Sequence, residues 1–341
     1  MDVLKEFSRK ATLAYARARQ PRNYVGPTLF PANPVNELTF EYFKDLNRLP
    51  VMASVQAFGA EAQIASREGF EKVSGEIPTI KRKIPLRGRE LVALRREGAG
   101  DAELVRNQLY NDLDNMIDAV NARIEQMRMD AVAYGKLELN ENGVVMTVDY
   151  GVPENHKDVL SGTDKWSDHA NANPIEVIQE WVNTIVADTG IRPTRALTSN
   201  TVVAHLLACA EVRRLIYGDN GGSRAISLNQ LNDLMDTMGL PQIATYDLQV
   251  RRQKADGTYE TVRFFPEDRF VILPGEPLGE TLMGPTEDAL LDPEIDTAEV
   301  AGIYAAVYKQ SQDPPVIYTL ASACAIPTFP LADAVFQAVV L

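Results

Sequence analysis

Few side chains in this 341-residue sequence are of the types that carry out acid–base, nucleophilic or metal chemistry. The chain holds three histidines (His156, His169 and His205) and two cysteines (Cys209 and Cys324). Neither cysteine has a second potential ligand at the spacing of a zinc site, so both are expected to be small buried side chains in a reducing compartment. Three scattered histidines are also few for a metalloenzyme or an acid–base enzyme.

Two short segments could still form a small site. The first contains Asp164, Trp166, Asp168 and His169. This combination of carboxylates, indole and imidazole is more typical of a polar loop that is held in place by one buried tryptophan. The second is an apolar run around His205, where we expect a partly buried histidine with a hydrogen-bond partner rather than a base.

Longer motifs of known chemistry do not occur in the sequence. The Gly218–Gly222 loop could cradle an anion, but its composition favours a flexible connection. There is no nucleophile elbow, P-loop, dinucleotide-binding motif or zinc-protease motif. We therefore predict no catalytic, cofactor-binding or metal-binding residue, no cofactor and no enzymatic activity. Because catalytic residues need only meet in space, a cytoplasmic α/β enzyme with a dispersed site stays open as an alternative.

The charges of the chain are unevenly distributed around a formal net charge of −13. Residues 1–100 carry 17 basic against 11 acidic side chains, whereas residues 101–341 carry 17 against 36. A chain this acidic is not expected to bind nucleic acids in general. The basic residues 1–100 of one copy could, however, attract the acidic residues 101–341 of a neighbouring copy. No segment is long and apolar enough to predict a membrane span, and residues 1–22 lack the apolar region of a signal peptide, so we expect a cytoplasmic protein.

The clearest element of secondary structure that could position functional side chains is a helix predicted over residues 101–134. Asp101 follows a glycine and is a good N-cap, and Gly135 is a suitable C-terminal stop. Apolar residues recur at spacings of three and four and form one stripe: Leu109, Leu113, Met116, Ile117, Val120, Ile124, Met127 and Ala131. At about 1.5 Å per residue the helix would be roughly 50 Å long, which is typical of a structural spine.

Residues 1–50 are predicted to form an N-terminal arm. After a weak, charged helix the segment is punctuated by prolines, which favours an extended chain lying on another surface: Pro21, Pro27, Pro31, Pro34 and Pro50. The apolar side chains of Tyr24, Leu29 and Phe30 would be exposed on such an arm. They would need a partner surface, which indicates assembly with other subunits.

Residues 51–97 are predicted to form an extended hairpin, with one strand at 51–58 and a basic strand at 76–86. Such a ribbon is marginal alone in water and is expected to lie against neighbouring subunits. The charges of Lys81, Arg82 and Lys83 would either guard a strand edge or pair with acidic surface on the next copy.

The rest of the chain is predicted to be an α/β region followed by returning strands. Strands at 137–139 and 144–148 are joined by an Asn-Gly turn, which is a strong hairpin signal. Helices are expected at 175–187, 200–208, 211–217 and 228–238. Further strands are expected at 195–198, 243–245, 250–252, 261–264, 270–273, 301–308, 316–325 and 334–340.

Several short segments, taken together, resemble one protein family. They are Leu29–Pro31, Leu49–Met52, Gly75–Pro78, Lys81–Lys83, Tyr134–Lys136, Asp149–Gly151, Gly162–Ser167, Tyr308–Lys309, Asp313–Pro315, Ala321–Ala323 and Asp333–Phe336. Each segment is weak alone. In order and spacing, however, they are similar to the major capsid proteins of lambda-like tailed bacteriophages, the capsid E family.

This resemblance implies an α+β fold of the Hong Kong 97 capsid type. The implied domains are an N-terminal arm (1–50), an extended E-loop (51–98), a peripheral P-domain (99–167) with the spine helix 101–134, an α/β A-domain (168–295) and a return to the P-domain (296–341). The sequence shows no large N-terminal scaffolding segment like that of some relatives, so scaffolding is expected to be a separate protein.

The resemblance also implies a structural head protein that self-assembles into hexamers and pentamers of an icosahedral virion shell. The shell would form in the host cytoplasm and enclose double-stranded DNA without sequence-specific binding. Expected partners are other copies of the chain, a scaffolding protein, a portal and a decoration protein, with no membrane contact. A protein compartment of the same fold that holds an enzyme cargo is the nearest alternative.

Overall fold

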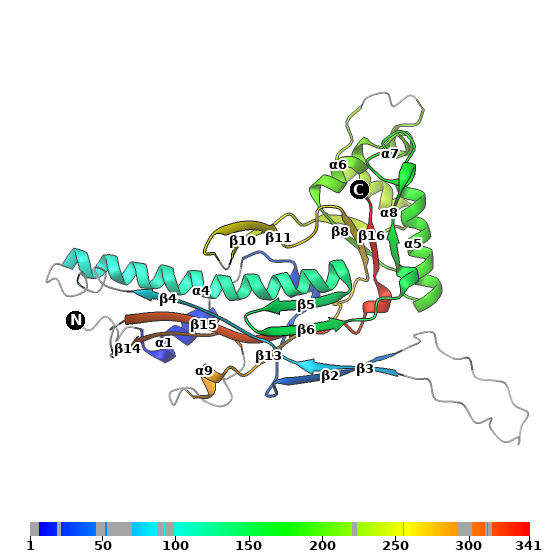
Figure 1. The fold of residues 1–341 in the computed structure, drawn as a ribbon. Helices are drawn as coiled ribbons and strands as arrows, with labels where there is room; N and C mark the ends of the chain where they lie inside the picture. Colours follow the sequence, from blue (N-terminus) through cyan, green and yellow to red (C-terminus); the bar gives the residue numbers. More distant parts are fainter. Residues whose placement is uncertain are drawn as a thin grey trace, which may run out of the picture. The chain divides into compact units, whose positions relative to one another are not determined.

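A computed structural model of the chain describes residues 7–18, 22–45, 52, 70–86, 92, 99–219, 224–254, 256–291, 302–310, 312 and 316–341. Helices and strands are mixed along the chain, as the predicted α+β class requires (Figure 1). The chain divides into two compact units. The first unit comprises 1–40, 74–128 and 280–328, and the second comprises 41–73, 129–279 and 329–341.

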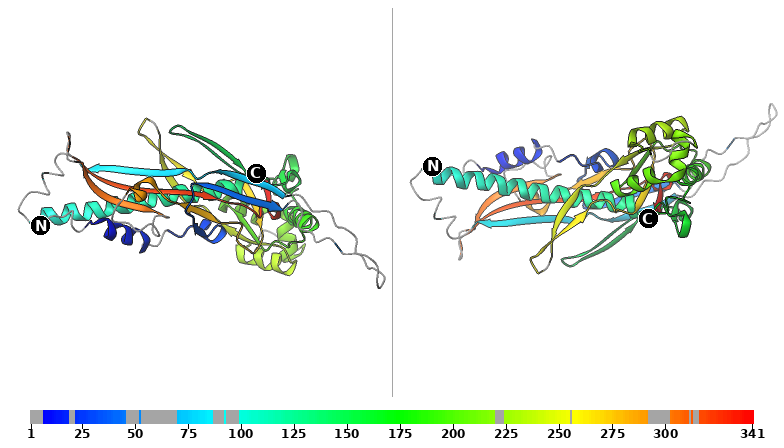
Figure 2. Two further views of the ribbon diagram at one scale, coloured as in Figure 1. Left: turned by 90° about the horizontal axis from the view of Figure 1, so that it is seen from below. Right: turned by 90° about the horizontal axis from the view of Figure 1, so that it is seen from above.

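Helix α4 (Ala99–Tyr134) is a continuous helix of 36 residues. It confirms the predicted spine, and all eight residues of the predicted apolar stripe are buried. At one end of the stripe, Leu109 belongs to a core cluster of the first unit with Phe7, Leu86, Val307 and Ile317. Figures 1 and 2 show α4 lying along β4 (Thr79–Leu86), β14 (Tyr304–Gln310) and β15 (Val316–Pro327) in this unit. The stripe therefore faces one strand that precedes α4 in the sequence, β4, and two that follow it, β14 and β15.

The first unit is built on a five-stranded sheet whose central strand is β15 (Val316–Pro327). Strands β14 (Tyr304–Gln310), β13 (Thr281–Gly284) and β4 (Thr79–Leu86) each pair with β15 in antiparallel orientation. The short strand β1 (Ala32–Pro34) extends the sheet by pairing parallel to β13. Almost every residue of β15 is buried, because it has strand neighbours on both edges.

Strand β4 contains the basic segment that was expected to have little contact with its own subunit. That expectation is wrong for this strand, because Thr79 to Leu86 pair along their whole length with Cys324 to Ile317 of β15. Strands β2 (Thr39–Asp45) and β3 (Phe70–Glu76) form a separate two-stranded sheet. The predicted strand at 51–58 lies outside the described residues except for position 52.

The N-terminal arm also has more contact with its own subunit than expected. Helix α1 (Arg9–Ala18) is followed by the single turn α2 (Gly26–Leu29). Leu29 and Phe30 are 2% and 0% exposed, so the prediction that they need a neighbouring subunit is wrong. Both are buried because β1, directly after them, is hydrogen-bonded to the first-unit sheet.

The second unit contains a five-stranded sheet in the order β7-β16-β12-β8-β9. Its strands are β7 (Lys157–Val159), β16 (Phe336–Val339), β12 (Arg269–Leu273), β8 (Arg195–Thr198) and β9 (Gln242–Thr245). The pairs β7–β16 and β8–β9 are parallel, and the other two pairs are antiparallel. Of the returning strands, β14 and β15 belong to the first unit, whereas β16 pairs with β12 in the second.

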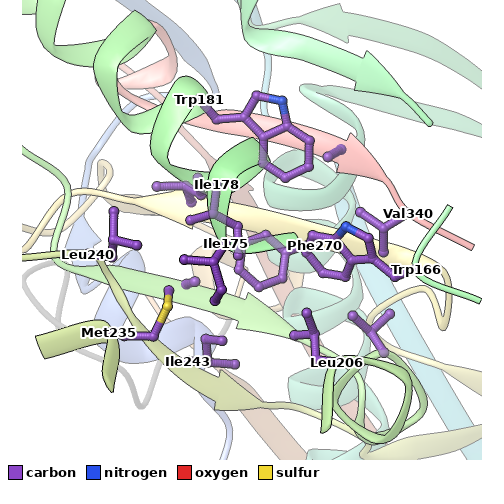
Figure 3. Packing of buried hydrophobic residues seen from close by; sticks show 14 of the residues in the cluster. Trp166, Ile175, Ile178, Trp181, Leu206, Met235, Leu240, Ile243, Phe270 and Val340 are labelled. Atoms are coloured by element: carbon purple, nitrogen blue, oxygen red, sulfur yellow. The ribbon is translucent and has the colours of Figure 1, made fainter. Parts of the chain in front are cut away.

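Four helices pack on this second sheet: α5 (Pro174–Thr189), α6 (Asn200–Ala208), α7 (Ala210–Tyr217) and α8 (Leu228–Thr237). All four coincide with predicted helices. Their ends follow local rules: the Val202 N–H donates to the Ser199 hydroxyl at the start of α6, and Gly190 ends α5 with a left-handed φ of 73°. Figure 3 shows the core beneath them, where Trp166, Trp181 and Phe270 meet aliphatic side chains from the helices.

Two hairpins complete the second unit. Strands β5 (Lys136–Glu141) and β6 (Val144–Asp149) are joined through Asn142 and Gly143, both with positive φ, as the Asn-Gly signal predicts. Strands β10 (Gln249–Gln253) and β11 (Tyr259–Arg263) form the other hairpin. The remaining elements are α9 (Glu287–Leu290) in the first unit and 3-10 turns at Glu154–His156, Gly162–Asp164 and Ala332–Ala334. Among the described residues, none of the helices is both long and apolar enough to cross a membrane.

Candidate assembly surfaces

Both cysteines are buried, as predicted. Burial raises the pKa of the Cys209 thiol to about 11, and burial also raises the pKa of the Cys324 thiol. A thiol with a raised pKa carries little thiolate at neutral pH and is a poor nucleophile or metal ligand. These two residues act as small core side chains.

His156 is a fully buried histidine with a structural role. Its Nδ1 lies 3.2 Å from the Val335 carbonyl oxygen, and its Nε2 lies 3.1 Å from Asp188 Oδ2. Both ring nitrogens are therefore engaged, and the ring ties the end of α5 to the chain before β16. No substrate could reach the imidazole without opening this unit.

The predicted Trp166 loop is a polar loop held by its tryptophan. Trp166 is fully buried and meets Phe270 edge to face at 5.0 Å between ring centres (Figure 3). Asp168 accepts hydrogen bonds from the backbone N–H groups of Ala170 and Asn171, which fixes the turn. This arrangement confirms the loop interpretation rather than a site of carboxylates around an indole.

The structure brings together two histidines that the sequence pattern had treated separately. His169, in the Trp166 loop, lies with its Nε2 2.9 Å from Nδ1 of His205 on α6. His205 is half-buried and has a hydrogen-bond partner, as predicted. Desolvation, and then the proximity of His169, lower the pKa of His205. No sequence signal links the two positions, because the contact depends on how the loop packs against α6.

A cavity of about 370 Å³ lies in the second unit. Its lining comes from the end of α4, the β5–β6 hairpin and the β7–β16–β12 edge of the sheet: Tyr134, Lys136, Asp149, Lys157, Asp158, Val159, Arg269, Gln337 and Val339. Arg269 donates to the Ala133 carbonyl oxygen, and Gln337 donates to that of Val132. These side chains cap the C-terminus of α4, which is a structural task.

Only Gly218 and Asp219 of the Gly218–Gly222 loop are among the described residues. Within the described ranges, no group of three or more histidine, cysteine, aspartate or glutamate side chains is placed to hold a metal ion.

The basic face of β4 has an acidic partner on its own chain. Lys81 Nζ lies 3.0 Å from Glu287 Oε2 and 3.1 Å from Asp288 Oδ2, both at the start of α9. Although desolvation lowers it, hydrogen bonds to these carboxylates raise the pKa of Lys81 overall. The acidic surface that was expected on a neighbouring copy is thus, for Lys81, supplied within the subunit. Lys83 instead lies over the Tyr318 ring, 4.9 Å from its centre.

A buried polar cluster joins the arm to the spine helix. Glu125 is fully buried on α4, and its Oε1 accepts a hydrogen bond of 3.0 Å from the Gly26 N–H. One turn further, Arg128 lies 3.6 Å from Glu125 and donates from Nε to the Thr281 hydroxyl at 2.8 Å. Thr281 in turn donates to the Phe30 carbonyl oxygen. We call these residues the arm clamp, since they connect the arm, α4 and β13.

The β10–β11 hairpin is a candidate contact surface. Within the described residues its two strands pair only with each other, and Figure 2 shows it extending away from α5–α8 of its own unit. One face carries Arg251, whose guanidinium lies 4.6 Å from the Tyr259 ring centre. The other face carries the half-buried Val250 and Val262. Such a ribbon has little core of its own, so a neighbouring surface would stabilise it.

The identity of the chain is decided by a family comparison. The model of the family described as "Phage major capsid protein E" matches residues 11–340. The chain belongs to this family. It is therefore a structural protein of a phage head and a component of the virion, and the resemblance of its short segments is confirmed over nearly the whole chain. A comparison of the chain with curated protein sequences found no significant match.

Solved structures agree with this assignment at the level of the fold. A chain assigned as the capsid protein of a prophage in Escherichia coli CFT073 matches with a TM-score of 0.62 at 16% identity, covering 97% of each chain. A phage-related protein of Bordetella bronchiseptica RB50 matches with a TM-score of 0.50 at 14% identity, covering 96% of each. A cyanophage A-1(L) capsid chain matches with a TM-score of 0.51 at 12% identity, covering 95% of each. The Hong Kong 97-type capsid fold is thereby confirmed.

Proposed function

We propose that copies of this chain form the hexamers and pentamers of an icosahedral head that encloses double-stranded DNA. The observation that carries the proposal is the match to the major capsid family over residues 11–340. The net charge of −13 supports it, because an acidic shell can enclose a polyanion without binding it tightly. The work of such a protein lies in its interfaces, and we propose that it has no catalytic activity.

We further propose that the parts of the chain have the domain roles that the capsid fold suggests. Residues 1–50 act as the arm, 51–98 as the E-loop, 99–167 and 296–341 as the P-domain, and 168–295 as the A-domain. Scaffolding, portal and decoration proteins are the proposed partners, and assembly takes place in the host cytoplasm. Support for a subunit contact through residues 168–295 comes from the β10–β11 hairpin, whose two strands pair only with each other among the described residues.

Electron microscopy of negatively stained protein tests the proposal directly. The purified chain, expressed alone and together with a candidate scaffolding protein from the same genome, should form capsomers, closed shells or tubes. A small soluble species under all conditions would contradict it.

A compartment with an enzyme cargo would also form shells, so a second observation must separate it from a phage head. Terminase, portal and protease genes beside the coding sequence are expected for a head protein. A neighbouring enzyme gene whose product co-purifies inside the particles would instead favour the compartment.

A further inference from the structure

His169 and His205 place two imidazole nitrogens within hydrogen-bond distance of each other. Nε2 of His169 and Nδ1 of His205 are 2.9 Å apart, and the ring centres are 5.1 Å apart with 39° between the planes. His169 is exposed and His205 is half-buried, so the pair lies at the surface of the second unit. None of the assembly surfaces described above includes it.

The backbone holds both histidines in place without help from their side chains. The His169 carbonyl oxygen accepts a 2.8 Å hydrogen bond from the Ala210 N–H at the start of α7. The His205 carbonyl oxygen accepts from the Cys209 N–H at 3.1 Å and from the Cys209 thiol at 3.3 Å. Both residues are thereby fixed to the α6–α7 junction. The backbone of the site is thus fixed before a ligand binds, and only the two imidazole rings remain to be ordered by it.

We propose that His169 and His205 form a chelating site for one divalent transition-metal ion, with Cu²⁺ or Ni²⁺ preferred. Neutral imidazole is a good ligand for copper, nickel and zinc. In the metal-free pair the facing nitrogens point at each other, so each ring must turn by about 45° before both lone pairs reach one ion. With metal–nitrogen distances of about 2.05 Å, two nitrogens 2.9 Å apart then subtend about 90° at the metal. That angle suits the tetragonal geometry of Cu²⁺ and Ni²⁺, whereas tetrahedral Zn²⁺ requires the nitrogens to move apart by about 0.4 Å.

The remaining coordination positions are taken by water. Cys209 is close in sequence, but its thiol is buried and donates to the His205 carbonyl oxygen. The carboxylate of Asp168 is held by the side-chain amide of Asn171 at 2.9 and 3.0 Å. Hard ions such as Mg²⁺ and Ca²⁺ prefer oxygen ligands and are excluded by a pair of imidazoles.

Metal binding replaces the hydrogen bond between the two rings. In the metal-free pair one of the facing nitrogens carries the proton and the other accepts it. When the ion binds, that proton moves through solvent to the other nitrogen of its own ring, so both facing lone pairs coordinate the metal and the net charge of the rings is unchanged. The ion then links the Trp166 loop to α6 and stabilises the folded second unit by mass action.

Binding of Cu²⁺ and Ni²⁺ to the full chain, purified without a histidine tag, tests the proposal. Titration calorimetry should show one ion per chain, and the copper electron paramagnetic resonance spectrum should show coupling to two imidazole nitrogens. His169→Gln and His205→Gln should each lower the affinity by at least about tenfold, since losing even an outer-shell partner of a metal costs about 10–100-fold. Mg²⁺ should give no heat.

The third histidine provides the internal control. His156 is buried between Asp188 and Val335, so its imidazole nuclear magnetic resonance signals should not move while those of His169 and His205 broaden or shift. Equal affinity in the His169→Gln/His205→Gln double variant would overturn the site. So would unmoved His169 and His205 signals in the unmodified chain, a measurement that does not depend on any variant folding.

Discussion

A single glycine at position 26 determines how the arm meets the spine. A Cβ atom built at Gly26 would overlap Glu125 Oε2 and lie 2.6 Å from Arg128 Cδ. Flexible side chains on a surface could move aside, but Glu125 is fully buried and is held by the Gly26 N–H. Any shift therefore breaks a buried hydrogen bond to a charged group, which is among the more costly local changes in a protein.

Replacing Gly26 tests this contact. Gly26→Ala should destabilise the subunit by about 1–3 kcal/mol, because a buried carboxylate loses a charge-assisted hydrogen bond. Chemical denaturation measures the change, and hydrogen exchange should show faster exchange at residues 22–35. Thr28→Ala is the control: it removes only an exposed hydrogen bond to the Val25 carbonyl oxygen in the same turn, so its effect should be much smaller. Unchanged protection of the arm in Gly26→Ala would contradict the arm clamp.

At the scale of elements, α4 is stable because one stripe is buried along most of its length. Ile117 lies within that stripe and is 2% exposed. Ile117→Asp would place an unpaired charge in the core, and we expect a loss of several kcal/mol or failure to fold. The matched control is Asn115→Asp, which adds the same charge at an exposed position of the same helix. If both variants melt like the parent, the stripe is not the packing face.

Elements with a local signal were predictable from the sequence, and elements that depend on distant partners were not. The Asn142–Gly143 turn, the helix end at Gly135 and the stripe on α4 each rest on residues within a few positions of one another. The placement of β4 beside β15 does not, since it joins residue 79 to residue 324. The same holds for the His169–His205 contact. Sequence patterns report which faces are apolar but not which distant strand or loop covers them.

The element-scale prediction for β4 separates contacts within a subunit from contacts between subunits. Lys81→Glu should place three acidic groups together and lower the stability of the isolated subunit by roughly 1 kcal/mol, because partly exposed pairs contribute about 0–1 kcal/mol each. A second change, Asp288→Lys, should restore it. Lys83→Glu, two positions along the strand, is the control and should have a smaller effect.

A different result would favour the hypothesis that the basic residues of β4 pair with acidic surface on a neighbouring copy. If Lys81→Glu leaves the melting of the subunit unchanged but blocks shell formation, then its partner lies on a neighbouring copy. Denaturation of unassembled protein and light scattering during assembly measure the two effects separately.

At the scale of the whole molecule, two electrostatic effects oppose each other during assembly. Every copy carries a net charge of −13, so copies repel at long range, and added salt would weaken this repulsion and speed assembly. Residues 1–100 nevertheless carry an excess of basic side chains, and residues 101–341 an excess of acidic ones. Complementary regions attract at short range, and salt would weaken this attraction and slow assembly.

We expect the short-range attraction to dominate the rate, because docking subunits bring complementary regions to distances shorter than the Debye length of about 10 Å at 0.1 M salt. The assembly rate, followed by light scattering, should therefore fall as sodium chloride rises from about 0.05 to 0.5 M, where screening becomes shorter than a typical contact. A neutral osmolyte at matched osmolality is the control and should not reproduce the decrease. A rate that rises with salt would show instead that net repulsion or apolar burial governs assembly, since screening and salting-out both favour those routes.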